Sequence, residues 1–418
     1  MQRAGSEQFK VDGLSSIPDE KVRGYQSFVT LLQQGHGYSG QFLEDTADDI
    51  RHAEESYTAK GHTESIWALR DKFTGKERGW FANDPLDGVL GVMSHDPATS
   101  TEYLDPVHND NLEYLLHGRD WDTVIDHYAT PPGGTTTGLP VMAEDGDDRK
   151  GFGDALTAVA TGVDPHGSRP VGLTSHTDAN NRVFVHALDV LSGQGGNMPA
   201  SLRDDMAKIM ANHGHETYVA MSDPSNHRQP DHGPKMDRNQ VMEITKQISR
   251  SEHSYGLLHE GMNYAIMDDI HDNSRRPEDT LNSAGYAVGF MEEGRYQALK
   301  GDQHDYTWDK AWSYHTSGAL LNFIPVYGDI AQRGADVLTS SWIMDEQQHQ
   351  ADKLTSDNQA TYDHRQNQLN AIARQWYAAN SDWASSRTGY SQDDGIYKQI
   401  AAAANDGNAL ARGSSGDQ

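Results

Sequence analysis

The densest group of side chains that could carry chemistry lies between residues 213 and 232. It combines histidines with one glutamate, and the candidate ligands are His213, His215, Glu216, His227 and His232. Imidazoles and carboxylates bind zinc and similar divalent ions, and ligands two residues apart on a turn can share one ion. Because the chain has 21 histidines, such a group also arises by chance. We therefore expect no bound metal or other cofactor, and keep these five residues as the candidates for one.

Two other segments carry residue types that hydrolytic enzymes use. His259-Glu260 resembles the first half of a zinc-protease helix, which requires a second histidine one helical turn later. Asn263 occupies that position and is a poor ligand, so the protease interpretation is rejected. The acidic run from Asp268 to Asp272 could supply paired carboxylates for acid–base hydrolysis, but an exposed acidic helix end is the simpler interpretation. The sequence assigns no catalytic residue.

The charge balance excludes several classes of partner. With 34 basic and 62 acidic side chains, the chain has a formal net charge of −28, whereas nucleic acids and anionic lipids are bound by basic surfaces. Cysteine is absent, which excludes disulfides and thiolate chemistry. The first twenty residues lack the apolar core of a signal peptide, and the longest apolar run, near residue 320, is too short to span a membrane. We expect a soluble protein without a stable membrane anchor, cytoplasmic or exported without a cleaved signal peptide.

The elements that must position these groups are predicted to be helices. Leu86, Val89, Leu90 and Met93 recur at the spacing of one buried helical stripe. Asp-Pro pairs at 84–85, 96–97 and 105–106 mark the ends and starts of further short helices, because the residue before proline avoids the α region and aspartate caps helices. A strand signal is limited to residues 183–185. The predicted fold class is all-α, an irregular bundle of many short amphipathic helices with longer helices in the C-terminal third.

Shifts in composition divide the chain into regions. Residues 131–150 are rich in turn formers and then acidic, which is typical of a linker or a long surface loop. An apolar stretch broken at Pro325 and continued to Trp342 predicts a helical hairpin over 319–344. The expected regions are a flexible lead (1–18), an N-terminal helical region (19–130), the linker (131–150), a central helical region (151–348), C-terminal amphipathic helices (349–404) and a disordered tail (405–418).

A heptad pattern runs through the predicted C-terminal helices. Its large apolar members are Tyr362, Leu369, Ile372, Trp376 and Trp383. Two interpretations stay open. Either this stripe packs on its own domain, or it is an interaction seam for a partner protein or for a homo-oligomer.

Three stretches carry a family resemblance. The main one, from Trp80 to Trp121, reads WFANDPLDGVL, then HDPATSTEY, NLEYLL and RDW; the others begin at Gly24 and at Phe323. Together they resemble large, uncharacterised helical proteins of actinobacteria of the Streptomyces type, which are associated with type VII-like secretion and polymorphic-toxin systems. The resemblance covers most of the chain, and it implies membership rather than a mechanism.

Three functional hypotheses follow. The first, from the resemblance and the absence of a catalytic motif, is a non-enzymatic structural, interaction or delivery module of an actinobacterial secretion or toxin-associated system, with a protein partner. The second is a hydrolase or metal-dependent secreted effector that uses the histidine group or the run 268–272. The third is a membrane-acting toxin that inserts the hairpin 319–344, although Asp329, Arg333 and Asp336 make insertion costly.

Overall fold

A computed structural model describes residues 2–10, 21–70, 81–128, 140–166, 176–225, 227–230, 233–301, 357–392 and 394–414. Over these ranges the chain is mostly helical, with two antiparallel strand pairs, so the predicted all-α class is confirmed. Within the described ranges, no helix combines the length and the apolar character needed to cross a lipid bilayer. The hairpin predicted over 319–344 lies outside the described residues. The chain divides into two compact units, residues 1–167 and 168–418.

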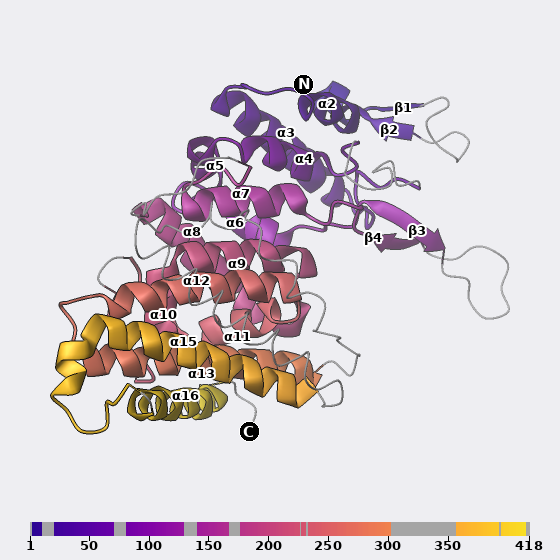
Figure 1. Cartoon of the computed structure of the whole chain (residues 1–418). Helices are drawn as coiled ribbons and strands as arrows, with labels where there is room; N and C mark the ends of the chain where they lie inside the picture. The colour runs from indigo at the N-terminus through magenta and orange to yellow at the C-terminus, as the bar shows by residue number, and fades with distance from the viewer. Residues whose placement is uncertain are drawn as a thin grey trace, which may run out of the picture. The chain divides into compact units, whose positions relative to one another are not determined.

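The first unit is an array of short helices with two small hairpins. Its helices are α1 (Gln2–Ser6), α2 (Gly24–Leu32), α3 (Gly40–Thr58), α4 (Pro85–Met93), α5 (Pro97–Leu104), α6 (Asn111–Glu113), the π-helix η1 (Tyr114–Gly118) and α7 (Lys150–Thr161) (Figure 1). Its strands are β1 (Gln8–Lys10), β2 (Lys21–Arg23), β3 (Val124–Tyr128) and β4 (Pro140–Ala143). In register, Phe9 lies opposite Val22 and Val124 lies opposite Ala143. The strands are short, so the packing of this unit depends on its helices.

The Asp-Pro pairs cap helices as the sequence predicted. Asp84 accepts hydrogen bonds from the backbone N–H groups of Leu86 and Asp87 at the start of α4, and Asp96 accepts one from Ala98 at the start of α5. The stripe of α4 that starts at Leu86 is fully buried. The third pair differs, because Asp105 ends α5 and the next helix begins only at Asn111.

A buried charge network joins α3, α4 and the end of η1. The guanidinium of Arg119 contacts Glu54 Oε1 at 2.5 Å and Asp84 Oδ2 at 2.6 Å. Glu54 also accepts hydrogen bonds from the indole of Trp67 at 2.6 Å and from the hydroxyl of Tyr114 at 2.7 Å. Burial lowers the pKa of Arg119, but the two carboxylates raise it by more, so this side chain stays charged.

The second unit contains the longer helices. They are α8 (Asp178–Gln194), the short 3₁₀ turns η2 (Gly195–Asn197) and η3 (Ala200–Leu202), α9 (Arg203–Asn212), α10 (Gly214–Ser222), α11 (Arg238–Ile248), α12 (Glu252–Ile270), α13 (Pro277–Gly301), α15 (Asp357–Ser385) and α16 (Gly395–Ser414). The last helix packs along α13 at close range (Figure 1). A Cβ added to Gly289 of α13 would lie 2.0 Å from the carbonyl oxygen of Ala404, and one added to Gly407 of α16 would lie 2.6 Å from that of Tyr286. These glycines therefore set the distance between the two backbones.

Several predicted boundaries differ from the structure. Residues 405–414 continue α16 instead of forming a disordered tail, because their small side chains fit against α13. Part of the predicted linker 131–150 forms β4. The boundary between the two units falls at residue 167 instead, and α7 packs with α4 and α5 in the first unit. The lead includes α1 and β1, and β1 pairs with β2. Residues 183–185 are helical, because Val183 and Phe184 recur with Leu188 and Leu191 at the spacing of one buried face of α8.

The heptad stripe of α15 packs within the second unit. Leu369, Ile372 and Trp376 are buried, and the Trp376 indole donates hydrogen bonds to the Pro277 carbonyl at 2.8 Å and to Thr280 Oγ1 at 3.1 Å. Trp383 is half-buried against Trp376 and Tyr390, and the side chain of Tyr362 lies outside the described residues. These contacts favour the intramolecular interpretation, so the proposed interaction seam is wrong for the three buried residues.

Substitution at the α13–α16 contact provides a test of this packing. We expect Gly289→Ala to lower the free energy of unfolding by about 1–3 kcal/mol, because the added methyl group forces two backbones apart. The matched control is Gly193→Ala in α8, where a Cβ meets nothing within 4 Å and alanine gains up to about 1 kcal/mol of helix propensity. Urea unfolding followed by circular dichroism measures both. Equal effects of the two variants would contradict the close contact.

The charge network of the first unit has its own prediction. Arg119→Met leaves the carboxylates of Glu54 and Asp84 buried without their cation, and we expect a loss of about 3–5 kcal/mol in the free energy of unfolding. Arg3, whose side chain is 96% exposed, is the control, and Arg3→Met should change stability by less than about 0.5 kcal/mol. Thermal and urea unfolding of both variants check the difference.

Candidate metal centre

The junction between α9 and α10 brings together two members of the predicted histidine group. The N–H of His213 donates to the Ile209 carbonyl at 2.9 Å, and the His213 carbonyl accepts from Thr217 N–H at 3.0 Å. The chain departs from helical geometry at His213, where ψ is 39°, and α10 begins at the next residue. Glu216 then falls in the first turn of α10, and both side chains are buried.

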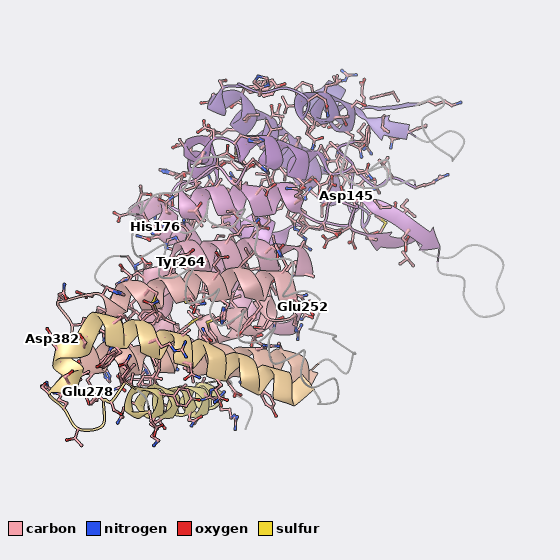
Figure 2. All side chains as sticks on the ribbon, in the orientation of Figure 1. Asp145, His176, Glu252, Tyr264, Glu278 and Asp382 are labelled. Atoms are coloured by element: carbon pink, nitrogen blue, oxygen red, sulfur yellow. The ribbon has the colours of Figure 1, made fainter. Side chains whose placement is uncertain are left out.

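His176 joins this pair from a distant part of the sequence. It lies just before α8 (Figure 2), whose first turn is fixed by a capping box between Thr177 and Asn180. Its imidazole stacks on that of His213, with ring centroids 3.6 Å apart and planes inclined by 17°. One ligand atom from each of His176, His213 and Glu216 lies within 4.8 Å of the others. In the described part of the chain, no other three His, Asp or Glu residues come together in this way.

Hydrogen bonding fixes which nitrogen of His176 is available as a ligand. Its Nε2 lies 2.6 Å from Oδ1 of Asn212, so Nε2 carries the proton and donates it. Nδ1 is then the unprotonated nitrogen, and it lies 4.0 Å from Glu216 Oε1. Burial lowers the pKa of His176, and the bond to Asn212 opposes this only in part. The imidazole is therefore neutral near pH 7, which is the state that binds a metal ion.

The spacing of the three ligand atoms is wider than that of a tetrahedral site. Zinc with bonds of about 2.0–2.1 Å holds its ligand atoms about 3.4 Å apart, so the side chains, now within 4.8 Å of one another, must move closer together around an ion. The lone pairs of two nearly parallel rings do not converge, so one imidazole must also tilt. Asn212 provides the orienting hydrogen bond that metal-bound histidines require on their other nitrogen. The arrangement can hold one divalent ion through two nitrogens and a carboxylate.

A glycine turn packs on the carboxylate of Glu216. Gly233 has φ of +80°, and a Cβ at this position would lie 2.1 Å from Glu216 Oε1. The positive φ strains any other residue at this position, and a Cβ there would require the Glu216 carboxylate to shift. The turn thus limits the room in which Glu216 can move.

The other predicted ligands do not join the group. His215 interacts electrostatically with Asp268 instead, and His227 is exposed in the loop after α10. His232 lies outside the described residues. His176 was missed because nothing in its local sequence distinguishes it from the other histidines, and only the fold brings it to the α9–α10 junction.

The two hydrolase-like segments have structural roles. Asn263 lies 3.2 Å from His259 and accepts a hydrogen bond from Gln368 at 2.9 Å, so it joins α12 to α15. Asp269, from the acidic run, accepts a hydrogen bond from the Tyr218 hydroxyl at 2.8 Å and pairs with Arg275.

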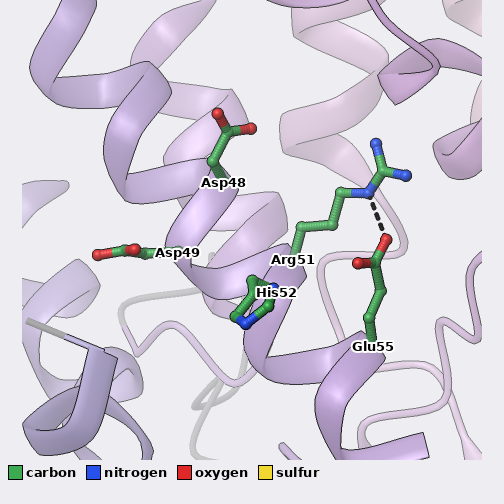
Figure 3. Close-up of a pocket in the computed structure, with 5 residues that line it drawn as sticks. All are labelled: Asp48, Asp49, Arg51, His52 and Glu55. Atoms are coloured by element: carbon green, nitrogen blue, oxygen red, sulfur yellow. Dashed lines mark hydrogen bonds and ion pairs between the residues drawn. The ribbon is translucent and has the colours of Figure 1, made fainter. Parts of the chain in front are cut away.

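A surface hollow lies beside α3 in the first unit (Figure 3). It is lined by Asp48, Asp49, Arg51, His52 and Glu55. Arg51 is already paired with Glu55 at 2.9 Å and with Asp110 at 2.7 Å. The lining residues all come from one helix, so they do not converge on a ligand from several sides.

Comparison of the chain with protein-family models, with curated proteins and with solved structures found no match.

The tautomer and charge of His176 can be measured directly in the metal-free protein. We expect a neutral ring protonated on Nε2 at pH 7, with a pKa below the ordinary value of 6.5. Asn212→Asp places a carboxylate against Nε2 and should raise that pKa, since an opposite charge favours the imidazolium. Long-range ¹H–¹⁵N spectra over a pH series follow both quantities. Asn239→Asp, at an exposed site, should leave the His176 titration unchanged.

Proposed function

We propose that this protein is a helical scaffold that holds one divalent ion of the zinc class through His176, His213 and Glu216. The convergence of these three side chains from two separate parts of the second unit carries the proposal, and both His213 and Glu216 are buried. Two imidazoles and a carboxylate suit zinc and neighbouring transition ions better than calcium or magnesium, which prefer all-oxygen sites.

The ion would act as a structural fastener. The ion would tie His176, which precedes α8, to the junction of α9 and α10. A ligand that binds only the folded chain stabilises the folded state. Two other buried carboxylates are already paired with cations, Glu54 with Arg119 and Asp269 with Arg275. We assign both of these pairs to the stability of the fold. We therefore infer a non-enzymatic role, in which the protein works through contact with a partner protein.

The biological setting is proposed from the sequence resemblance alone. It is a structural, interaction or delivery module of an actinobacterial secretion or toxin-associated system, in the cytoplasm or exported without a cleaved signal peptide. The net charge of −28 favours a partner with a basic surface. A pull-down from the native host with the intact chain tests this setting, and recovery of nucleic acid in place of protein would contradict it.

A second candidate function is metal-dependent hydrolysis, and one observation favours it. The group supplies three protein ligands, and sites of two histidines and one glutamate use the fourth position for a water that becomes the nucleophile. Zinc-loaded protein assayed on ester, phosphoester and peptide substrates tests this candidate. Turnover that is lost in Glu216→Gln would support it and replace the non-enzymatic proposal.

Metal titration tests the proposal itself. We expect one Zn²⁺ per chain by calorimetry and by elemental analysis. At a zinc concentration a hundredfold above Kd, the free energy of unfolding should increase by about 2.7 kcal/mol. His176→Ala and Glu216→Gln should weaken binding by more than tenfold, and Asn212→Ala, which removes the orienting hydrogen bond to His176, by about 10–100-fold.

The control is His227→Ala, which removes an exposed histidine outside the group and should bind like the parent protein. Absence of stoichiometric binding in the parent protein, or equal loss in the control, would overturn the proposal.

A further inference from the structure

Buried carboxylates outnumber buried cations where α4 meets the start of α7 in the first unit. Asp84, Asp87 and Asp145 interact electrostatically with one another, and Asp84 shares Arg119 with Glu54. All five side chains belong to residues that are at least nine-tenths buried. If every carboxyl group were ionised, four negative charges would face one guanidinium out of water, which is strongly unfavourable.

Asp87 holds the first turn of α7 from a distant part of the chain. Its two carboxylate oxygens accept hydrogen bonds from the backbone N–H groups of Gly151 at 3.0 Å and Phe152 at 2.7 Å. A Cβ on Gly151 would lie 1.9 Å from the carbonyl oxygen of Asp87, so the two helices touch through their backbones. The start of α7 therefore stays in place only while Asp87 keeps its position.

Asp145 holds the loop that leads into α7. Its carboxyl group accepts hydrogen bonds from the N–H groups of Asp147, at 3.0 Å, and of Asp84. Asp148 and Arg149 adopt positive φ angles of 48° and 61°, which are unfavourable for residues other than glycine. The loop 145–149 is thus strained and is fastened to α4 through Asp145.

The surroundings of Asp145 and Asp87 leave their negative charges largely uncompensated. Besides Arg119, the charged residues of the packed elements nearby are Glu54 of α3, Asp84 of α4, and Glu144, Asp147, Arg149 and Lys150 of the loop and α7, whereas Asp148 of the same loop is exposed. Arg149 is paired with Glu144, and Lys150 with Asp154. Burial first, and then Asp84 and Asp147, raise the pKa of Asp145 to about 7, and burial with Asp84 and Asp145 raises that of Asp87 well above its ordinary value.

We propose that Asp145 and Asp87 form a proton-controlled latch, which holds the loop 145–149 and the first turn of α7 on α4 in mild acid and loosens as the pH rises. The device lies in the first unit and does not depend on the metal centre.

Proton linkage sets the direction in which pH changes the stability of the closed latch. The closed latch keeps a proton that the hydrated, open loop loses at the ordinary aspartate pKa of 3.8. Closure is therefore fully favoured below pH 3.8. As the pH rises from there toward about 7, the equilibrium constant for closure falls by up to tenfold per pH unit for one proton.

Hydrogen exchange of the full chain at pH 5 to 7.5 tests the latch. After correction for intrinsic exchange rates, we expect the protection of the Gly151 and Phe152 amides to fall as pH rises, approaching tenfold per unit. Asp145→Asn keeps an oxygen that can accept the hydrogen bond from the N–H of Asp147, and its side chain cannot ionise. It should reduce this pH dependence and give higher protection than the parent protein at pH 7.5.

Asp148→Asn is the matched control in the same loop, because Asp148 is exposed. Asparagine also tolerates a positive φ, so protection should shift equally at every pH and the slope should remain. Protection that stays constant or rises with pH in the parent protein would overturn the proposal. A pH slope in Asp145→Asn equal to that in Asp148→Asn would overturn it as well.

Discussion

Arg119 keeps its charge in the interior of the first unit because Glu54 and Asp84 surround it. Neither carboxylate could be buried alone, since an unpaired interior charge costs several kcal/mol. The arrangement therefore requires α3, α4 and the end of η1 to fold together. Asp84 also caps α4, so the pairing positions the helix that fastens the loop 145–149 and α7.

The second unit depends on close backbone contact rather than on buried charge. Gly289 and Gly407 let α13 and α16 approach without side chains between them. Trp376 adds hydrogen bonds from α15 to the first turn of α13. Among these helices, the break at His213 provides ligands for a metal ion, because it places an imidazole and the carboxylate of Glu216 beside His176. A metal ion there would add a cross-link that does not rely on cysteine.

Both proposals follow from groups that the fold removes from water. Burial keeps the His176 imidazole neutral and ready to bind a cation, and burial makes Asp145 retain a proton. The same physical cause therefore acts in opposite chemical directions, because desolvation disfavours the charged form of either group. A carboxylate in this interior is neutralised by a partner cation, as at Arg119, or by a proton, as at Asp145.

The sequence by itself determined the all-α class, the short helices at the Asp-Pro pairs and the lack of thiol chemistry, because helical spacing, capping and composition are local properties. It could not reveal His176 as the third member of the candidate metal centre, since that contact joins distant segments. It also misjudged residues 405–414, whose polar, small side chains suggest disorder until α13 offers a matching surface. Tertiary structure decided these features, because burial and charge pairing exist only once distant segments meet.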